Sequence, residues 1–359
     1  MSKTTLTDLV CPECGNNFRI MRRTNKQKEM FHRKRMYCYV CKRITNHIEV
    51  KNIELFIADV EFSEYAYISP EKKKVYQIIK KGVTKMTVEE LLIFGKSHCH
   101  SDHAKILLAE LLNKNPLELL NYLEETVSRE IEEKYKNSIL ALEEGKPLQY
   151  VLGKVNFYGI EFYINQNVLI PRFETEELVE QTINYINRNW NTPIDLIDLG
   201  CGSGVIGLTL EQKVNTNSVE LIDISKEALE VTKKNKERLN SKAILIENNF
   251  LKGNNKKYDV IISNPPYIKT NEEIEEIVEM NEPHIALYAG EEGLDCYEAI
   301  LKNIKNNMKD KCLIAFEIGY DQKEDIINLV NTYLQNVKIE AKQDLSGRDR
   351  MLFILYNIE

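Results

Sequence analysis

The chain has 359 residues, a net charge of −7, 43% hydrophobic residues and 29% charged residues, which is an ordinary composition for a globular protein. No apolar run approaches the length of a membrane span, and the start lacks the apolar core of a leader peptide, so we expect a cytoplasmic protein that contacts no membrane. The length predicts two or three domains.

The first segment contains two closely spaced cysteine pairs. Cys11 and Cys14 stand in "CPEC", and Cys38 and Cys41 stand in "CYVC". Each pair can close a tight turn that offers two thiolates, and four soft ligands suit a closed, tetrahedral zinc site. The pattern predicts that residues 1–55 form a zinc-ribbon-like domain with one structural zinc ion.

The same segment is basic, although the chain as a whole is acidic. Residues 1–50 carry eleven lysines and arginines against four aspartates and glutamates, a local charge of +7 that leaves −14 for the rest. The basic residues between the cysteine pairs, interleaved with Phe18, Phe31 and Tyr37, are Arg19, Arg22, Arg23, Lys26, Lys28, Arg33, Lys34 and Arg35. This mixture fits contact with RNA, ribosomal RNA included; the alternative is a solvated charged surface that keeps a small domain soluble.

Three further segments precede the C-terminal part. Residues 56–85 are expected to be a connector, with a strand pair and then a helix as one interpretation. Residues 86–150 carry leucines at helical spacing, and Asn-Pro at 115 and 116 marks a break, which predicts a small helical domain for substrate recognition. The "HCHSDH" at its start is interpreted as a helix start at Ser101 and Asp102. Residues 151–190 are expected to hold a β-hairpin around Gly159 and a linker.

Residues 191–359 alternate short apolar runs with charged helical stretches. The runs are "IDLIDLG", "SVELIDI", "AILIEN", "YDVIISN", "CLIAFEIG", "VKIEAK" and "RMLFILYN". This alternation predicts an α/β fold with a doubly wound, mostly parallel sheet of seven strands. The last two runs lie close enough in sequence to pair antiparallel at one edge.

A glycine-rich turn follows the first of these strands. The stretch "DLGCGSG" places Asp198 before Gly200, Cys201, Gly202, Ser203 and Gly204, and it opens a helix. Glycines there let a ligand approach the backbone, and a helix start presents N–H groups. By itself this is also compatible with an empty turn or with a dinucleotide site. Asp223 at the end of the next strand could accept both hydroxyls of a ribose, and Asn249 follows the third strand, where an adenine would lie.

The fourth strand ends in "NPPY", which comprises Asn264, Pro265, Pro266 and Tyr267. Two prolines cannot continue a central strand, so a stiff loop must follow the strand. Such a loop could grip a planar amino group, whereas the alternative is a loop that only terminates the strand.

Taken together, these motifs resemble the class I S-adenosylmethionine-dependent methyltransferases. Over roughly residues 87–359, the motifs from "LQYVLGKVNFYGIEFYINQNVLIPRFETEELVE" through "ISNPPYI", "EPHIAL" and "FEIGY" to "DLSGRDRML" resemble the release-factor glutamine methyltransferases, the PrmC/HemK family. Phe173 stands where that family usually has proline, and Asn248 stands where an aspartate is common. The N-terminal zinc region lies outside the usual family outline.

The resemblance implies a methyl transfer to the glutamine of the Gly-Gly-Gln motif in class 1 peptide release factors. It implies that Asn264 accepts one hydrogen of the substrate amide, that the Pro265 carbonyl accepts the other, and that Tyr267 packs against the flat group. Two alternatives remain. One is an adenine amino-group methyltransferase acting on RNA or DNA, because an exocyclic amine poses the same problem. The other is a zinc-ribbon RNA-binding protein with an inactive methyltransferase domain.

Overall fold

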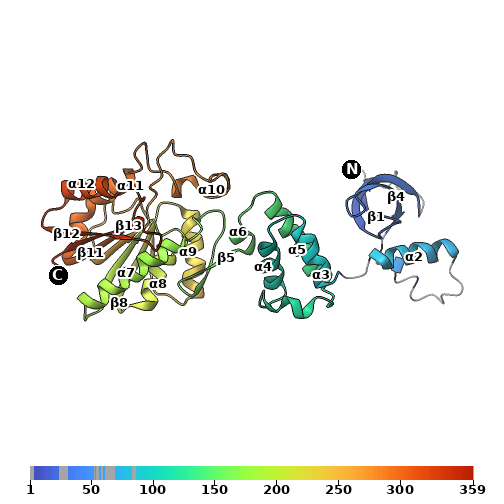
Figure 1. Ribbon diagram of the computed structural model, residues 1–359, viewed down its shortest axis with the longest axis horizontal. Coiled ribbons are helices and arrows are strands. Elements are labelled where there is room, and N and C mark those ends of the chain that lie inside the picture. Colours follow the sequence, from blue (N-terminus) through green and yellow to red (C-terminus); the bar gives the residue numbers. More distant parts are fainter. Residues whose placement is uncertain are drawn as a thin grey trace. The chain divides into compact units, whose positions relative to one another are not determined.

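The computed structural model describes residues 4–23, 31–51, 53, 56, 57, 60, 69–82 and 86–358 (Figure 1). The chain divides into two compact units, Met1–Phe94 with Leu111–Tyr135, and Gly95–Glu110 with Lys136–Glu359. Among the described ranges, no helix combines the length and apolar character that a membrane span requires.

The N-terminal residues form an antiparallel sheet of four strands in the order β2-β1-β4-β3. The strands are β1 (Thr4–Val10), β2 (Asn17–Arg23), β3 (Arg33–Cys38) and β4 (Arg43–Val50). Cys11 and Cys14 lie in the turn between β1 and β2, while Cys38 ends β3 and Cys41 lies in the turn between β3 and β4.

Helix α2 (Pro70–Gly82) packs against this ribbon. It starts with proline at the first helical position, where a missing N–H costs nothing, and Ser69 Oγ accepts the Lys72 N–H at 3.2 Å. Its apolar side chains share one buried cluster with the ribbon, and the cluster includes Ile48, Val50, Val75, Tyr76 and Ile79. The segment expected as a connector thus contributes to the N-terminal core. The strand pair considered for its first part lies largely outside the described residues.

The next segment is helical, as the leucine spacing predicted. Its elements are α3 (Val88–Lys96), α4 (Ser101–Leu111), the 3₁₀ helix η3 (Glu118–Tyr122), α5 (Arg129–Glu143) and α6 (Leu148–Leu152). Helix α4 begins at Ser101, and the Asn-Pro pair separates α4 from η3. At the start of α3, Thr87 Oγ1 accepts the Glu90 N–H and Glu90 Oε2 accepts the Thr87 N–H, which is a reciprocal capping box.

A short hairpin and a long helix lead into the main sheet. Strands β5 (Lys154–Phe157) and β6 (Ile160–Tyr163) pair around Tyr158 and Gly159, both at positive φ, as a tight hairpin turn demands. The linker expected after the hairpin contains α7 (Phe173–Asn189), whose buried face packs against the main sheet.

The seven-stranded sheet has the order β12-β13-β11-β10-β7-β8-β9 and is parallel except for β13. The strands are β7 (Ile194–Leu199), β8 (Thr216–Asp223), β9 (Ile244–Glu247), β10 (Tyr258–Ser263), β11 (Met308–Glu317), β12 (Val337–Gln343) and β13 (Asp349–Tyr356). The predicted doubly wound sheet is confirmed, and the last two strands pair antiparallel at one edge.

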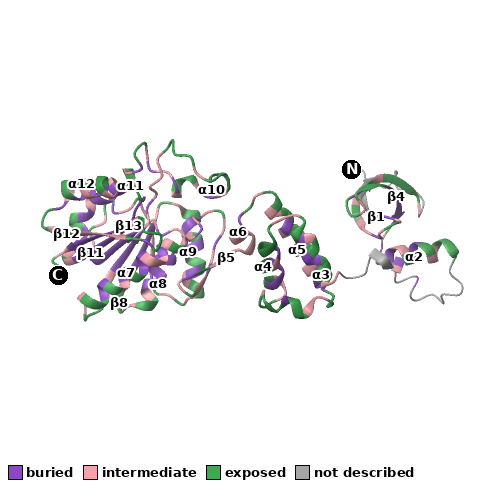
Figure 2. Ribbon diagram, in the orientation of Figure 1, coloured by how far each residue is buried: buried purple, intermediate pink, exposed green. Residues whose placement is uncertain are grey.

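Helices cover both faces of this sheet, and its central strands are buried (Figures 1 and 2). The intervening helices are α8 (Val205–Lys213), α9 (Lys226–Arg238), α10 (Glu276–Asn281), α11 (Asp295–Ile304) and α12 (Lys323–Tyr333), with 3₁₀ helices η4 (His284–Ala286) and η5 (Lys305–Asn307). Helices α7 and α8 pack on one face and α11 and α12 on the other. Alternate residues of each strand fill the two cores, which explains the continuous apolar runs in the sequence.

Candidate active site

The strand order reverses beside β7, because β8 lies on one side of it and β10 on the other. In an open α/β sheet, ligands bind beyond the carboxyl ends of the strands at such a switch point. A pocket of about 270 Å³ lies there. The sequence-predicted residues that line it are Gly200, Cys201, Gly202, Ser203, Asp223, Asn249, Asn264 and Pro266. Asp198, Gly204, Pro265 and Tyr267 are not among its lining residues.

The glycine loop between β7 and α8 depends on left-handed backbone. Gly204 has a φ of +80°, and a Cβ added there would lie 2.7 Å from Thr232 Cγ2, so only glycine fits. Gly202, at a φ of +55°, donates its N–H to Asp223 Oδ2 at 2.8 Å. The loop is therefore tied directly to the end of the neighbouring strand β8.

Asp198 holds the loop from beneath. Its side chain is fully buried, and Oδ2 accepts the Gly207 N–H in the first turn of α8 at 2.9 Å. Burial raises the pKa of this carboxyl to about 7, against the opposing effect of the Gly207 hydrogen bond. Asp198 therefore positions the loop and the helix, and it does not face the pocket.

Helix α9 supplies two buried side chains that the sequence interpretation missed. Thr232 Oγ1 donates to the Gly202 carbonyl at 2.6 Å, and Asn235 Nδ2 donates to the Ser203 carbonyl at 2.9 Å. Asn235 Oδ1 also accepts the Tyr163 N–H at 2.7 Å, which ties the β5–β6 hairpin to the loop. Their only sequence signal is polarity at positions of α9 that face inward, where buried polar groups need partners.

Asp223 is the last residue of β8, and its carboxylate keeps hydrogen-bond acceptor positions that are not in use. Its Oδ2 accepts from Gly202, and its Oδ1 accepts the Ser225 N–H at 2.9 Å. Burial raises the pKa of Asp223, while the backbone donors at Ser225 and Gly202 lower it. A carboxylate has about four acceptor positions, so lone pairs remain on a side chain that lines the pocket. The part of the pocket beside Asp223 therefore offers hydrogen-bond acceptors that fit the vicinal hydroxyls of a ribose.

The turn after β9 forms another wall of the pocket with Asn248, Asn249 and Phe250. Asn248 Oδ1 accepts the Asn249 N–H, and Asn248 Nδ2 donates to the Lys252 carbonyl, both at 2.9 Å. An aspartate could not make the second bond, so the departure from the family pattern at Asn248 stabilises this turn. The ring of Phe250 lies beside the glycine loop: a Cβ atom added to Gly200 would lie 3.6 Å from Phe250 Cε1. The ring offers an aromatic face to a ligand in the pocket.

Asn264 follows β10 at the same edge. Ser263 Oγ donates to the Leu199 carbonyl at 2.6 Å and thereby joins the ends of β10 and β7. Asn264 Nδ2 donates to Thr175 Oγ1 in the first turn of α7 at 3.2 Å. Tyr267 packs partly against the α11 and α12 core, and its carbonyl accepts from Gln322 Nε2 at 2.9 Å. The loop after β10 is thus held at both ends.

The "IPR" and "EPHIAL" motifs meet beside the pocket. Arg172 donates to Glu282 Oε1 at 2.6 Å, and the other carboxylate oxygen accepts the Ile170 N–H at 2.9 Å. Phe173 is the first residue of α7 and is 61% exposed, so it does not line the pocket. Proline is well accommodated at that helical position, which explains why phenylalanine and proline can alternate there.

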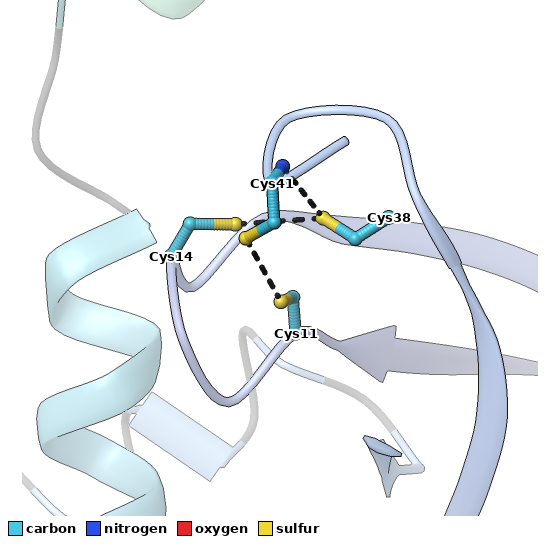
Figure 3. A group of neighbouring side chains, drawn as sticks. All are labelled: Cys11, Cys14, Cys38 and Cys41. Carbon is cyan, nitrogen blue, oxygen red and sulfur yellow. Dashed lines mark hydrogen bonds between the residues drawn. The ribbon is translucent and has the colours of Figure 1, made fainter. Parts of the chain in front are cut away.

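The four N-terminal cysteines form a separate group, and their sulfur atoms all lie within 4.8 Å of one another (Figure 3). Cys11 Sγ is 3.7 Å from Cys41 Sγ, and Cys14 Sγ is 3.6 Å from Cys38 Sγ. Tetrahedral zinc with Zn–S bonds of about 2.3 Å places its sulfur ligands ~3.8 Å apart. The Cys41 N–H also points at Cys38 Sγ at 3.4 Å.

Two domain families match this chain: the PrmC N-terminal domain at residues 100–153 and the Methyltransferase small domain at residues 183–282. The release factor glutamine methyltransferase of Bacillus subtilis is 36% identical over 260 residues, which are 70% of this chain and 90% of that protein. The Bacillus cereus protein of the same name is 35% identical, covering 69% of this chain and 90% of its own length. The Streptococcus pneumoniae protein is 34% identical, with coverages of 74% and 94%.

The chain belongs to the release factor glutamine methyltransferase family. It is therefore an S-adenosylmethionine-dependent methyltransferase, which confirms the class that the motifs suggested. The two matches begin at residues 100 and 183, so the cysteine ribbon lies outside both of them.

Proposed function

We propose that this methyltransferase transfers a methyl group to the side-chain amide nitrogen of the glutamine in the Gly-Gly-Gln motif of class 1 peptide release factors. The observation that carries the proposal is the placement of Asn264 at the pocket edge with its NH₂ group turned toward Thr175. The planar amide then leaves Oδ1 as an acceptor, and no donor from the described part of the chain hydrogen-bonds to it. The relatives' names support release factors as the substrate class.

An amide nitrogen is a poor nucleophile, because its lone pair is delocalised into the carbonyl. In our proposal, Asn264 Oδ1 and the Pro265 carbonyl each accept one amide hydrogen from outside the amide plane, which favours a pyramidal nitrogen whose lone pair is no longer delocalised into the carbonyl. Pro265 and Pro266 have no N–H that could compete for these acceptors. When bound, S-adenosylmethionine would supply an electrophilic methyl group whose C–S bond breaks as the N–C bond forms; S-adenosylhomocysteine would leave as a neutral thioether, and the methylated nitrogen would lose one proton to solvent. The protein's contribution is then mainly alignment, which can account for many orders of magnitude in rate.

We propose that the other end of the pocket holds this methyl donor. Asp223 accepts the ribose hydroxyls, the backbone of Gly200 and Gly202 allows close approach, and Asn249 and Phe250 flank the adenine. The remaining acceptor positions of Asp223 and the exposed face of Phe250 support this assignment.

A labelling experiment tests the function. The purified protein is incubated with methyl-labelled S-adenosylmethionine and, separately, with a release factor, with the same factor carrying alanine in place of the motif glutamine, and with total RNA. We expect label only in the release factor that keeps the motif glutamine. Label in RNA alone would favour the adenine amino-group alternative and would contradict the proposal.

We also propose that Cys11, Cys14, Cys38 and Cys41 bind one structural zinc ion. Their sulfur spacing supports a tetrahedral site with no open position. Elemental analysis of the native protein should find one zinc per chain, and Cys14→Ser with Cys38→Ser should lose it. A native protein without zinc, or a double variant that retains it, would contradict the assignment.

Finally, we propose that one face of the ribbon contacts single-stranded RNA, ribosomal RNA being the expected source. The register of β3 and β4 pairs Tyr37 with Ile44 and Arg35 with Asn46, so these side chains share one face. Arg33, Arg35, Tyr37 and Ile44 are exposed, and Tyr39 lies edge-on to Tyr37 at 5.2 Å between ring centroids. Exposed rings beside Arg33 and Arg35, which form no ion pair with the residues that the structure describes, suit base stacking and phosphate contact.

Not every basic residue of the ribbon is available for this contact. Arg19 is paired with the buried Asp8 at 2.9 Å, and Arg43 is paired with Glu13 at 2.6 Å. Lys26 and Lys28 lie outside the described residues. Filter binding of single-stranded RNA should weaken at least tenfold in Arg33→Glu with Arg35→Glu, whereas the exposed pair Lys233→Glu with Lys305→Glu serves as the control. If RNA affinity fell equally in both double variants, or did not fall in Arg33→Glu with Arg35→Glu, the RNA contact would be refuted. The basic residues would then be a solvated surface.

A further inference from the structure

A buried carboxylate lies behind Asn264, and neither the sequence motifs nor the relatives assign it a role. Glu317 ends β11, next to β10, and Ser263 is paired in register with Phe316. The residue after each of those two therefore falls at the same edge of the sheet. Glu317 is 1% exposed and lies behind the pocket wall, whereas Thr175, which is 3% exposed, is itself one of the residues that line the pocket.

Thr175 connects the carboxylate to the pocket. Its Oγ1 donates to Glu317 Oε2 at 2.6 Å, and the same oxygen receives Asn264 Nδ2 at 3.2 Å. Burial raises the pKa of the Glu317 carboxyl, and the nearby Asn264 side chain lowers it slightly. Side chains from β11, α7 and the loop after β10 thus form one chain of hydrogen bonds from Glu317 through Thr175 to Asn264.

The chemistry of these groups permits one hydrogen-bond direction. An ionised carboxylate can only accept hydrogen bonds, so Thr175 must donate its single hydroxyl hydrogen to Glu317. The Thr175 oxygen then acts as an acceptor toward Asn264, and Asn264 must present its NH₂ to the network. Because the amide is planar, its Oδ1 is turned away from the network.

We propose that Glu317, acting through Thr175, is a positioning residue that fixes the amide orientation of Asn264 so that Oδ1 faces the substrate amide. Thr175 lines the pocket and Glu317 does not, and Glu317 has no proton-transfer role. Without the acceptor-only partner, the Asn264 amide could turn by about 180° and present NH₂ to a substrate NH₂, which would repel it. The proposal rests on the proposed function, since it explains how the amide-gripping acceptor is held.

The surroundings of Glu317 hold the network in place. Tyr297 Oη donates to the Glu317 main-chain carbonyl at 2.7 Å, and the Arg350 guanidinium donates to the Ile318 carbonyl at 3.2 Å. The charged Arg350 lowers the pKa of the carboxyl, whereas Glu174 raises it; with burial as the dominant cause, the pKa lies at about 7. Assays at pH 8 therefore observe the ionised form.

The decisive variants differ in hydrogen-bonding rather than in size. Glu317→Gln introduces a donor where only acceptors stood, Thr175→Val keeps the shape but removes the hydroxyl, and Thr175→Ser keeps the hydroxyl but removes a methyl group. If Thr175 only filled space, valine would be tolerated better than serine. If it orients Asn264, serine will be active and valine will not.

At pH 8 we expect Glu317→Gln and Thr175→Val to lower kcat about 10- to 100-fold with release factor as substrate, and Thr175→Ser to stay within about threefold of the wild type. The affinity for S-adenosylmethionine, measured by calorimetry, should be unchanged in all three, which also shows that the pocket is folded. The matched control is Glu340→Gln. Glu340 accepts from Tyr185 Oη on the same helix α7, but it lies on β12, away from the pocket.

The outcomes separate the two proposals. A wild-type protein that does not methylate release factor would defeat the proposed function itself. An active wild type with equally active Glu317→Gln and Thr175→Val would overturn only the positioning role. Loss of kcat in Glu340→Gln as large as in Glu317→Gln, or valine more active than serine at position 175, would assign the effect to general anchoring of α7 and would also overturn it.

Discussion

The catalytic sheet and the N-terminal ribbon hold their chemical groups in different ways. Asn264 follows β10, a strand of six buried residues between two parallel neighbours, so packing on both faces fixes its place. The interior of the ribbon instead contains buried polar side chains, among them Thr7, His47 and Glu49. The apolar cluster that the ribbon shares with α2 is small, so burial stabilises the ribbon less than it stabilises the large sheet. The proposed zinc ion would add the free energy of metal binding to the folding of the ribbon.

The largest expected effect is therefore confined to the ribbon. Removing zinc with a strong chelator should unfold it, since structural zinc contributes on the order of 10 kcal/mol to such domains. Limited proteolysis should then cleave within residues 1–51, while the methyltransferase sheet stays resistant and binds S-adenosylmethionine as before. A chelated protein with a protease-resistant ribbon would show that packing, not metal, holds the four strands together.

The next largest effect concerns the acceptor in the catalytic sheet. Asn264→Ala should lower kcat about 10²- to 10³-fold, as the loss of one preorganised polar contact to a reacting group does, and leave cofactor affinity nearly unchanged. Asn303→Ala is the control, because among the described residues Asn303 Nδ2 donates to the Ala299 carbonyl within α11 and to no other group. Near wild-type turnover in Asn264→Ala would refute the amide grip.

Asp223→Asn should act on the opposite end of the pocket. Loss of the charged acceptor should weaken binding of S-adenosylmethionine about 10- to 100-fold, since hydrogen bonds to charged groups contribute about 1.5–3 kcal/mol. The kcat at saturating cofactor should change little, in contrast to Asn264→Ala. Calorimetry measures the affinity, and the exposed Asp310→Asn is the control. An unchanged affinity would remove Asp223 from the cofactor site.

The smallest expected effect is a pH trend in stability. Burial raises the pKa of Glu317 from 4.5 to about 7. The carboxyl therefore does not destabilise the fold below pH 4.5; its destabilising effect grows between pH 4.5 and about 7 and is complete above that range. The full penalty is about 3 kcal/mol at most. The melting temperature of Glu317→Gln relative to the wild type should therefore be more favourable at pH 8 than at pH 5. Asp198, with a similar pKa, is common to both proteins and cancels. The opposite trend would mean that the carboxyl is ionised in the fold well below pH 7.

The sequence predicted those parts of the fold that depend on local signals. The strand runs, the glycine loop and the "NPPY" turn are contiguous, so the sheet and the main pocket residues followed from them. Thr175 and Glu317 could not be found in this way, because 142 residues separate them and only the packing of α7 over β11 brings them together. For the same reason, the contribution of α2 to the ribbon core became visible only in the folded chain.

The most direct test of the central claim is a crystal structure of the protein with a class 1 release factor and the demethylated form of the cofactor. We predict that Asn264 Oδ1 and the Pro265 carbonyl both lie within hydrogen-bond distance of the side-chain nitrogen of the motif glutamine, with Asn264 Nδ2 still on Thr175. A complex in which Asn264 Oδ1 points away from that nitrogen, or in which the glutamine lies outside the pocket, would contradict the account.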